Sequence, residues 1–501
     1  MKINSLLIAN RGEIAIRVIQ TAKLMGIETW VLKTSKEPNA LYLSAADHVI
    51  DFSDHTDEIL EFLDIEKIIR AAKDHKIDAV HPGYGFLAES PVFAQRCEDE
   101  KLIFIGPSPD AILKMGNKTI AKQLARKHKI PLLEGSLGDV KDPTEAKIIA
   151  SKIGYPVILK AASGGGGRGM RIVENEKEIE KMFKMASSEA AKAFNDPAVF
   201  VEKYVRNPRH IEFQIFGDKQ GNIIHLGERE CSVQRKHQKL IEESPSAALD
   251  TDLRERMGKA AINIAKTVDY YSAGTVEFLL DSDNNFYFME MNTRIQVEHP
   301  VTEMVTGLDL IEWQIRVAQD EPLPLKQKDV KITGWAFEFR INAEDVQAGF
   351  SPSLGVIEKM SLPKSKNIRI DSGIQEGAII TPYFDSMIAK LIIYGETREK
   401  AIQYSASALK KLWIKGLKTT IPFCKEVLNN SNFKKGKYDT SFLVKEMKIH
   451  YFQDKDAELL AAYFATYDFA RRLKEDEDKS VDFEKGKSIT PWILNKRMKS
   501  L

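Results

Sequence analysis

The stretch from Thr275 to Asn292 predicts a β-hairpin, because two runs of β-branched and aromatic residues flank an Asp/Asn-rich turn. If the hairpin is symmetric about its turn, Glu277 lies directly opposite Glu290. Like charges at facing positions destabilise a sheet, so we expect a divalent cation between the two carboxylates. Asn292 would share their face and add an amide oxygen, a ligand set that suits Mg²⁺ bound to nucleotide phosphates. The alternative is an exposed hairpin with two solvated glutamates.

The composition is that of an ordinary soluble protein. The chain has 501 residues, 43% hydrophobic and 29% charged, and its 73 Lys and Arg balance 72 Asp and Glu. This length predicts roughly three domains, and the balanced charge predicts binding to neither nucleic acid nor membrane. The three cysteines fit a reducing compartment, and the N-terminal apolar run is too short for a signal peptide. We therefore expect a cytoplasmic protein.

Residues 1–115 alternate strand and helix patterns. The apolar run at 5–9 predicts a strand, the segment 12–20 a helix, and the segment 29–32 a second strand. Repeated βα units imply a doubly wound parallel sheet. The turn after the first strand lacks Gly-x-Gly-x-x-Gly, so the fingerprint of a dinucleotide-binding domain is missing.

Residues 116–205 form a second predicted unit around a glycine-rich loop at 161–169 that joins two strands. This loop is not a P-loop, because it leads into a strand and no Gly-x-x-x-x-Gly-Lys-Ser/Thr occurs. Its four consecutive glycines allow backbone N–H groups to approach phosphate closely, and Lys160 and Arg168 frame it. We therefore predict a flap over phosphates, with an ordinary flexible hairpin as the alternative.

The rest of the chain divides by pattern into three segments. Residues 206–330 combine strands with a helix, and residues 331–446 show short β segments followed by a helix. Residues 447–501 predict a helix and a charged tail that packs on the chain's own surface or on a partner. The predicted fold class is α/β and α+β, with an N-terminal doubly wound parallel sheet and a C-terminal mixed β domain.

The segment from Glu228 to Lys239 is densely charged. It has no amphipathic period, and such a pattern is typical of a solvated loop. The alternative is that Gln234, His237 and Lys239 donate hydrogen bonds to a bound anion. Cys231 has no evident partner base, so we do not expect a nucleophile there.

Arg294, Gln296 and Glu298 have the spacing of residues on one face of a strand. A glutamate beside an arginine stays ionised, so Glu298 could act as a base on a small acid that Arg294 binds. Arg340, which ends a β run, is a further candidate anion site. Taken one at a time, each of these residues is more often part of a surface ion pair.

Six stretches together resemble biotin carboxylase, a member of the ATP-grasp superfamily. They are Ile8 to Ala15, His81 to Glu89, Ser163 to Met170, Glu228 to Lys239, Glu290 to His299 and Tyr383 to Ile388. The resemblance spans residues 1–446 and implies an ATP-grasp lid over 116–205 and an ATP-grasp central domain over 206–330. It also implies ATP-dependent carboxylation of biotin on a separate carrier, with bicarbonate as carbon source and carboxyphosphate as intermediate.

By position, the resemblance implies a role for each matching residue. The residues implied to bind ATP are Lys118, Lys160, Gly166, Gly167, Glu202, Lys203, Tyr204, Val205, His210, Gln234, His237 and Leu279. Those implied to bind two Mg²⁺ or Mn²⁺ ions are Glu277, Glu290 and Asn292. Those implied to hold bicarbonate or biotin are Lys239, Arg294, Gln296, Val297, Arg340 and Asp385. The implied catalytic residues are Lys239, Arg294, Glu298 as the base toward bicarbonate, and Arg340 as the stabiliser of the biotin enolate.

The resemblance implies partners as well. A biotin carboxyl carrier protein would deliver biotin, a carboxyltransferase subunit would use the carboxybiotin, and the chain would be a homodimer. The final acceptor stays open among acetyl-CoA, which would link the chain to fatty acid biosynthesis, propionyl-CoA, another acyl-CoA and pyruvate. Two rival functions are another ATP-grasp ligase, such as a carbamoyl-phosphate synthetase, and an inactive scaffold subunit. The complete set of ionisable residues argues against the scaffold.

Overall fold

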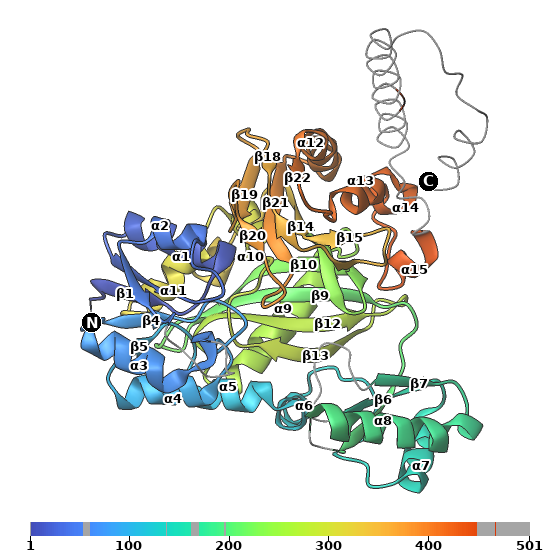
Figure 1. The fold of residues 1–501 in the computed structure, drawn as a ribbon. Coiled ribbons are helices and arrows are strands. Elements are labelled where there is room, and N and C mark those ends of the chain that lie inside the picture. Colours follow the sequence, from blue (N-terminus) through green and yellow to red (C-terminus); the bar gives the residue numbers. More distant parts are fainter. Residues whose placement is uncertain are drawn as a thin grey trace, which may run out of the picture. The chain divides into compact units, whose positions relative to one another are not determined.

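The computed structural model describes residues 2–53, 61–136, 138–161, 170–194 and 197–447, together with Thr466 (Figure 1). The chain divides into two compact units, Met1–Ile449 and His450–Leu501. The predicted glycine-rich loop, with Gly166, Gly167 and Arg168, lies outside the described residues, and so does nearly all of the predicted tail. Among the helices that are described, none combines the length and the apolarity needed to cross a membrane.

The N-terminal sheet is parallel and has the strand order β3-β2-β1-β4-β5. Its strands are β1 (Ser5–Ile8), β2 (Glu28–Lys33), β3 (His48–Asp51), β4 (Ala79–His81) and β5 (Ile103–Phe104). The connecting helices are α1 (Gly12–Leu24), α2 (Leu41–Ala45), η1 (Glu61–Leu63), α3 (Ile65–Asp74), α4 (Pro91–Asp99) and α5 (Pro109–Gly116). Side-chain caps start three of them, because Asp64 accepts from the N–H of Lys67, Ser90 from that of Phe93 and Ser108 from that of Ala111. The predicted doubly wound parallel sheet is confirmed.

A small antiparallel sheet with the order β7-β6-β8 follows (Figure 1). Its strands are β6 (Val157–Ala161), β7 (Met170–Val173) and β8 (Val199–Lys203), and its helices are α6 (Lys118–Lys127), α7 (Pro143–Ile153), η2 (Glu176–Glu178) and α8 (Ile179–Phe194). Val157, Leu159 and Val201 alternate along the strands and are fully buried with Phe183 of α8 in one apolar cluster. These strands therefore hold Lys160 and Glu202, which lie between the core positions, at fixed places on the sheet.

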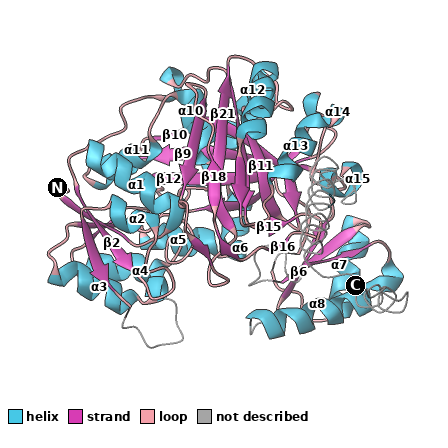
Figure 2. Ribbon diagram, turned by 45° about the horizontal axis from the view of Figure 1, so that its top comes forward, coloured by secondary structure: helices cyan, strands magenta, loops and turns pink. Residues whose placement is uncertain are grey.

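The largest sheet has eight antiparallel strands in the order β13-β12-β9-β10-β11-β14-β21-β19 (Figure 2). They are β9 (Arg209–Gly217), β10 (Ile223–Arg235), β11 (Gln238–Ser244), β12 (Ser272–Leu280), β13 (Phe286–Asn292), β14 (Trp335–Asn342), β19 (Ile368–Ser372) and β21 (Met387–Gly395). The helices along this part are α9 (Thr251–Lys266), α10 (His299–Thr306), α11 (Leu310–Ala318) and η3 (Gln327–Asp329). Because β11 pairs with β14, the sheet continues across residue 330, where the sequence predicts a domain boundary.

The remaining elements lie in the C-terminal part of the first unit. Its short strands are β15 (Glu344–Asp345), β16 (Ser351–Pro352), β17 (Gly355–Val356), β18 (Lys359–Ser361), β20 (Ile379–Ile380) and β22 (Trp413–Lys415), all paired antiparallel. Its helices are α12 (Arg398–Lys411), α13 (Ile421–Asn429), α14 (Ser431–Lys434) and α15 (Phe442–Glu446). The short β segments and the helix predicted for this part are confirmed.

The charged segment from Glu228 to Lys239 is not a solvated loop, so that prediction is wrong. It forms most of β10 and the start of β11, near the middle of the eight-stranded sheet. Glu228, Arg229 and Glu230 are fully buried, because neighbouring elements supply opposite charges to them. Local pattern could not show this, since the compensating charges come from distant parts of the chain.

Candidate active site

The β12–β13 hairpin pairs as the sequence predicts around its two carboxylates, with Glu277 directly opposite Glu290. The register shifts by one residue between Glu277 and Phe278, so the symmetry ends there. Asn292 lies at the end of β13, and its Nδ2 donates to Glu277 Oε1 at 3.0 Å. Glu277 is buried and Glu290 is half-buried. The structure thus brings together the three residues that the sequence predicts as metal ligands.

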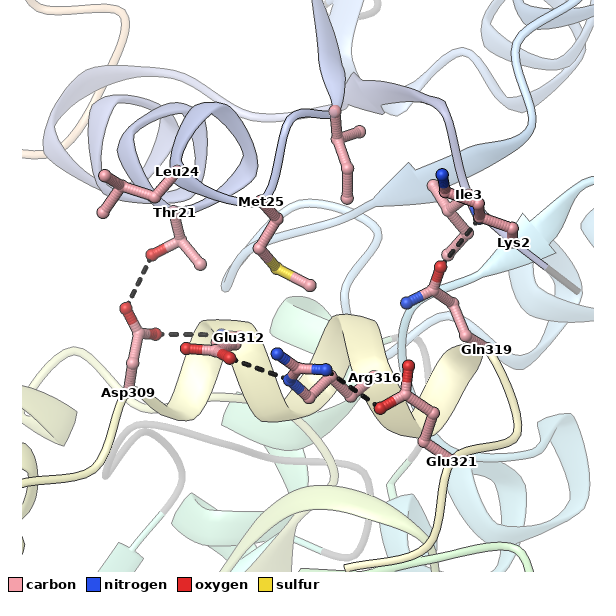
Figure 3. A pocket seen from close by; sticks show the side chains of 11 residues that line it. Lys2, Ile3, Thr21, Leu24, Met25, Asp309, Glu312, Arg316, Gln319 and Glu321 are labelled. Atoms are coloured by element: carbon pink, nitrogen blue, oxygen red, sulfur yellow. Dashed lines mark hydrogen bonds and ion pairs between the residues drawn. The ribbon is translucent and has the colours of Figure 1, made fainter. Parts of the chain in front are cut away.

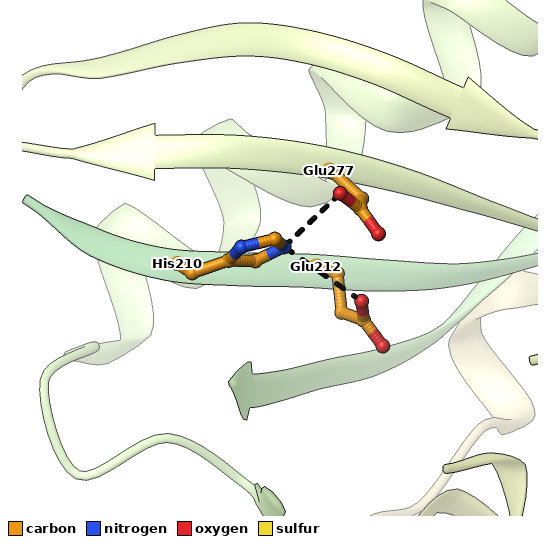
Figure 4. A group of neighbouring side chains, drawn as sticks. All are labelled: His210, Glu212 and Glu277. Atoms are coloured by element: carbon orange, nitrogen blue, oxygen red, sulfur yellow. Dashed lines mark ion pairs between the residues drawn. The ribbon is translucent and has the colours of Figure 1, made fainter. Parts of the chain in front are cut away.

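Glu277 also belongs to a charged cluster on the face of the sheet. His210 and Glu212 on β9 lie beside it on the adjacent strand (Figure 4). His210 Nε2 lies 3.1 Å from Glu277 Oε2, and Lys239 Nζ donates to Glu277 Oε1 at 2.9 Å. Burial raises the pKa of Glu277, but Lys239 and His210 outweigh this effect and hold the pKa well below its usual range. Glu277 is therefore ionised and available to a cation.

Lys239 is the cation at the centre of the cluster. Its Nζ donates to Glu212, to Glu277 and, at 2.7 Å, to Glu298 Oε1. Burial lowers the pKa of Lys239, but the three carboxylates outweigh burial and raise it well above its usual value. A permanent ammonium group is thus held among three acids, where it can turn toward a bound anion.

Glu298 is fully buried and lies between two cations. Arg340 Nη2 donates to its Oε2 at 2.9 Å, and Lys239 contacts its other oxygen. Cys231 Sγ lies 4.0 Å from Oε1, and burial raises the pKa of its thiol well above the usual value, which disfavours the reactive thiolate.

The predicted extended segment from Arg294 to Glu298 is wrong. Strand β13 ends at Asn292, and Glu298 is the residue that directly precedes helix α10. Arg294 does not supply the ion pair of Glu298; its Nε instead donates to Glu89 Oε2 at 2.8 Å. Arg294 nonetheless stays at the site, because its Nη2 donates to Asn292 Oδ1 at 3.1 Å and its Nη1 to Gln296 Oε1 at 2.9 Å.

The described residues that are predicted to bind ATP lie on or next to the small sheet, on α6, and on or next to strands β9, β10 and β12 of the large sheet. Lys160 Nζ of β6 lies 2.7 Å from Glu202 Oε2 of β8, and Lys118 Nζ of α6 lies 3.6 Å from Glu290 Oε2. Lys203 Nζ instead donates to the carbonyl of Gly154 at 2.9 Å. The backbone of Tyr204, the next residue, is also fixed, because its N–H donates to the carbonyl of Pro156 at 3.1 Å. Val205 follows directly.

Four further predicted residues occupy distinct places. Gln234 is buried at the end of β10, and His237 is exposed in the turn to β11. Leu279 pairs with His210 across β12 and β9. Asp385 precedes β21, and its Oδ1 accepts from the Met387 N–H at 3.0 Å.

Three protein-family models together match most of the chain. The model described as "Biotin carboxylase, N-terminal domain" matches residues 2–112, and "Biotin carboxylase C-terminal domain" matches 338–445. Between them, "Carbamoyl-phosphate synthase L chain, ATP binding domain" matches 117–326. Biotin carboxylase 1 of Bacillus subtilis is 49% identical over 442 residues, which cover 88% of this chain and 98% of that protein.

The chain belongs to the biotin carboxylase family. It is therefore an ATP-dependent ligase that carboxylates biotin. The alternative of a carbamoyl-phosphate synthetase is rejected, because the domains on both sides of the ATP-binding domain match biotin carboxylase. The 2-oxoglutarate carboxylase small subunit of Hydrogenobacter thermophilus is 45% identical over 460 residues, covering 92% of this chain and 97% of that one.

Solved biotin carboxylase structures share the fold. One of them is the biotin carboxylase domain dimer of the H. thermophilus 2-oxoglutarate carboxylase, solved in complex with MgADP, ADP and bicarbonate. The match has a TM-score of 0.86 at 46% identity and covers 90% of this chain and 99% of that chain. The Campylobacter jejuni biotin carboxylase in complex with β,γ-ATP has a TM-score of 0.85 at 47% identity and covers 89% and 99%.

The biotin carboxylase site contains charged residues that the sequence did not reveal. Glu212, Glu242 and Glu89 each pair with one of the predicted cations, Lys239, Arg340 and Arg294. One signal was available for Glu212: polar residues alternate with apolar ones at 210–215, which is typical of a strand with one polar face. No local signal marks Glu89 or Glu242.

A separate pocket of about 530 Å³ lies between α1 and α11 (Figure 3). Its lining includes no residue predicted for the biotin carboxylase site. Arg316, its central cation, already pairs with Glu312 at 2.7 Å and Glu321 at 3.0 Å. The central cation of the pocket is thus already paired with two carboxylates, and the lining favours no particular ligand.

Proposed function

We propose that Glu298 is the base of the carboxylation reaction, supported by Lys239, Arg294 and Arg340. The observation that carries this proposal is the buried carboxylate of Glu298, which accepts from Lys239 Nζ at 2.7 Å and from Arg340 Nη2 at 2.9 Å. Burial raises the pKa of Glu298, but Lys239 and Arg340 outweigh it, so the pKa lies well below its usual range. The carboxylate is therefore ionised at neutral pH, as a base must be before it accepts a proton.

Bicarbonate binding would strengthen this base. Lys239 and Arg294 would hold the anion, and Gln296 would add an amide. A hydrogen bond that Lys239 donates to bicarbonate is withdrawn from Glu298, so the pKa of Glu298 rises when the substrate is bound. The proton of bicarbonate can then move to a Glu298 oxygen.

The two half-steps follow from this arrangement. The deprotonated bicarbonate oxygen attacks the γ-phosphorus of ATP, the bond to the β-phosphate oxygen breaks, and ADP leaves carboxyphosphate behind. Carboxyphosphate then releases phosphate as its carboxyl group passes to the ureido nitrogen of biotin, and the proton of that nitrogen passes to the departing phosphate. Arg340 is placed to stabilise the enolate that biotin forms at this stage.

Glu277, Glu290 and Asn292 are the proposed ligands of two Mg²⁺ or Mn²⁺ ions. They fit a hard cation, because two carboxylates face each other across the hairpin and an amide lies beside one of them. When bound, the ions neutralise charge on the phosphate oxygens of ATP. Glu290→Gln removes one ligand charge, so we expect it to lower kcat sharply at ordinary Mg²⁺; full activity would contradict the assignment.

The nucleotide site is proposed on the same grounds. Lys118, Lys160 and His237 would hold phosphates together with the loop at Gly166 and Gly167, which would close over them. The adenine and ribose would meet the residues Glu202, Lys203, Tyr204, Val205, His210, Gln234 and Leu279. Val297 would complete the bicarbonate site and Asp385 the biotin site.

A paired assay tests the base. Glu298→Gln is nearly isosteric but cannot accept the proton, so bicarbonate-dependent ATP cleavage with free biotin should fall by about 10²–10⁴-fold while ATP binding stays near normal. Arg340→Ala should damage carboxybiotin formation more than phosphate release. If Glu298→Gln retains both rates, the base lies elsewhere.

The complex around the chain is a further proposal. We expect a cytoplasmic homodimer that works with a biotin carboxyl carrier protein and a carboxyltransferase subunit, since curated relatives include subunits of pyruvate and 2-oxoglutarate carboxylases. The final acceptor, acetyl-CoA for fatty acid biosynthesis among others, is set by that transferase. Purification of the native complex and identification of its transferase would decide the acceptor. The domain limits at 115, 205, 330 and 446 also stay predictions.

A further inference from the structure

A third lysine stands beside the two that are proposed to hold ATP phosphates. Helix α6 carries Lys118 and, one turn later, Lys122. Lys122 Nζ forms an ion pair with Glu202 Oε1, while Lys160 Nζ lies 2.7 Å from Glu202 Oε2. One carboxylate thus holds two ammonium groups, one on each oxygen.

Glu202 is poorly suited to lose both partners. It is 6% exposed, and an ionised carboxylate at such a position is strongly destabilised without an opposite charge. Burial raises the pKa of Glu202, but Lys160 and Lys122 outweigh it and lower the pKa to about 2. The group therefore remains charged at neutral pH and needs at least one cation at all times.

Lys122 is held in place more tightly than an ordinary surface lysine. Its Nζ lies 5.3 Å from the centre of the Phe200 ring, on the same strand as Glu202, in addition to its ion pair. Its side chain is 21% exposed, compared with 26% for Lys160. Lys160, by contrast, lies at the end of β6, directly before the glycine-rich segment.

We propose that Lys122 is a positioning residue that serves as the standing counter-ion of Glu202 and thereby frees Lys160 to move to the phosphates of ATP. The inference rests on the proposed role of Lys160. With Lys122 present, Lys160 can exchange Glu202 for phosphate without leaving a buried carboxylate unpaired. Without Lys122, the same exchange strips Glu202 of its last cation, so Lys160 stays bound to Glu202 and ATP binds more weakly.

The first test replaces Lys122 by Met, which keeps the apolar stem and removes the charge. We expect the Kd and KM for ATP to rise about tenfold, equivalent to about 1.4 kcal/mol, while kcat at saturating ATP changes less than about twofold. Lys127→Met is the matched control, because Lys127 is an exposed lysine on the same helix, and its KM should not change. An unchanged ATP affinity in Lys122→Met overturns the inference.

A double variant separates a counter-ion from a direct phosphate ligand. Glu202→Gln removes the charge that Lys122 balances, so Lys122→Met should have no further effect on ATP affinity in the Glu202→Gln background. If the tenfold loss persists there, Lys122 binds the nucleotide itself and the inference is wrong. Should Lys122→Met unfold, as a melting curve would show, Lys122→Gln takes its place in the same cycle.

A third variant distinguishes this inference from the proposed function. Lys160→Met should weaken ATP binding in either background, because it removes the proposed phosphate ligand. If Lys160→Met binds ATP normally, the role of Lys160 is wrong and the inference falls with it. If Lys160→Met binds weakly and Lys122→Met binds normally, the proposed function stands and only the inference is overturned.

Discussion

Strand β1 of the N-terminal sheet and strand β10 of the eight-stranded sheet are both buried, but they are built from opposite kinds of residue. In β1 the side chains of Leu6, Leu7 and Ile8 are fully buried. In β10, three consecutive charged residues from Glu228 to Glu230 are equally buried. The first strand needs only apolar neighbours, whereas the second needs a specific partner for every charge.

Arg229 shows how many partners such a strand requires. Its Nε donates to Glu212, its Nη1 to Gln214 at 2.7 Å and to Thr302 at 3.0 Å, and its Nη2 to Thr275 at 3.0 Å. These partners come from β9, β12 and α10, so one side chain ties three elements together. Because Glu212 also accepts from Lys239, the network reaches the proposed bicarbonate site. The buried charges of β10 thus help to position Lys239, one of the cations proposed to be catalytic.

The largest expected effect is that of Arg229→Met. Removing Arg229 takes one of two cations from the buried carboxylate of Glu212 and leaves Lys239 as the other, so the free energy of unfolding should fall by about 3–5 kcal/mol. Urea denaturation followed by intrinsic fluorescence would measure the loss. KM for bicarbonate should also rise, because Lys239 is then the cation that must balance Glu212 and is held more firmly by it. A loss below about 1 kcal/mol would mean that the pair is not buried as described.

The double variant Arg229→Met with Glu212→Leu tests whether the buried ion pair serves stability or activity. Replacing both charges by apolar groups restores a core like that of β1, and such replacements are often neutral or stabilising. We therefore expect stability to return to within about 1 kcal/mol of the wild type, while bicarbonate-dependent activity stays low. Recovery of activity together with stability would show that the network serves the fold alone.

Leu7→Ala in β1 should have the next largest effect. Leu7 is fully buried in the N-terminal core, and its truncation should cost about 2–5 kcal/mol through lost apolar contacts and the cavity that remains. This loss should be independent of pH between about 6 and 8, because no titrating group is removed. Leu24→Ala on the exposed face of α1 is the control and should change stability by less than about 0.5 kcal/mol.

The contrast between the two strands also explains what the sequence could predict. The β1 region follows local rules, so the apolar runs at 5–9 and 29–32 and the helix between them were placed correctly. The hairpin around Glu277 and Glu290 was placed as well, because turn chemistry sets its register locally. The start of β10 was predicted as a strand, but its charged part from Glu228 onward was interpreted as a loop, because the compensating charges lie on elements that no local pattern identifies.

The ion pairs of the site could not be predicted from the spacing of residues in the sequence, for the same reason. The alternation of Arg294, Gln296 and Glu298 suggested an arginine–glutamate pair on one strand, but the strand ends at Asn292. Glu298 takes its cations from β11 and β14 instead, since Lys239 and Arg340 belong to those strands. Which residue types form the site was predictable, and which of them touch was not.

The smallest expected effect concerns a second pair of buried acids, Glu242 and Glu338, which face each other across β11 and β14. Among the described residues, Glu242 Oε2 and both oxygens of Glu338 have no hydrogen-bond partner. Burial raises the pKa of Glu242 to about 7 and that of Glu338 well above its usual value. In the native state Glu338 is therefore protonated at a pH where an unfolded glutamate is ionised.

Glu338→Gln should consequently stabilise the protein, in contrast to Arg229→Met. The folded wild type holds a proton on Glu338 that the unfolded chain loses above its usual pKa of about 4.3, so the free energy of unfolding falls as pH rises. Glutamine has the shape of the protonated acid and no such linkage. The free energy of unfolding of the variant, relative to that of the wild type, should therefore increase by about 1.4 kcal/mol from pH 5 to pH 6. Glu255→Gln, on an exposed position of α9, is the control and should show no such gain. Urea denaturation at the two pH values measures both variants, and parallel curves for Glu338→Gln and wild type would show that Glu338 is ionised in the folded protein.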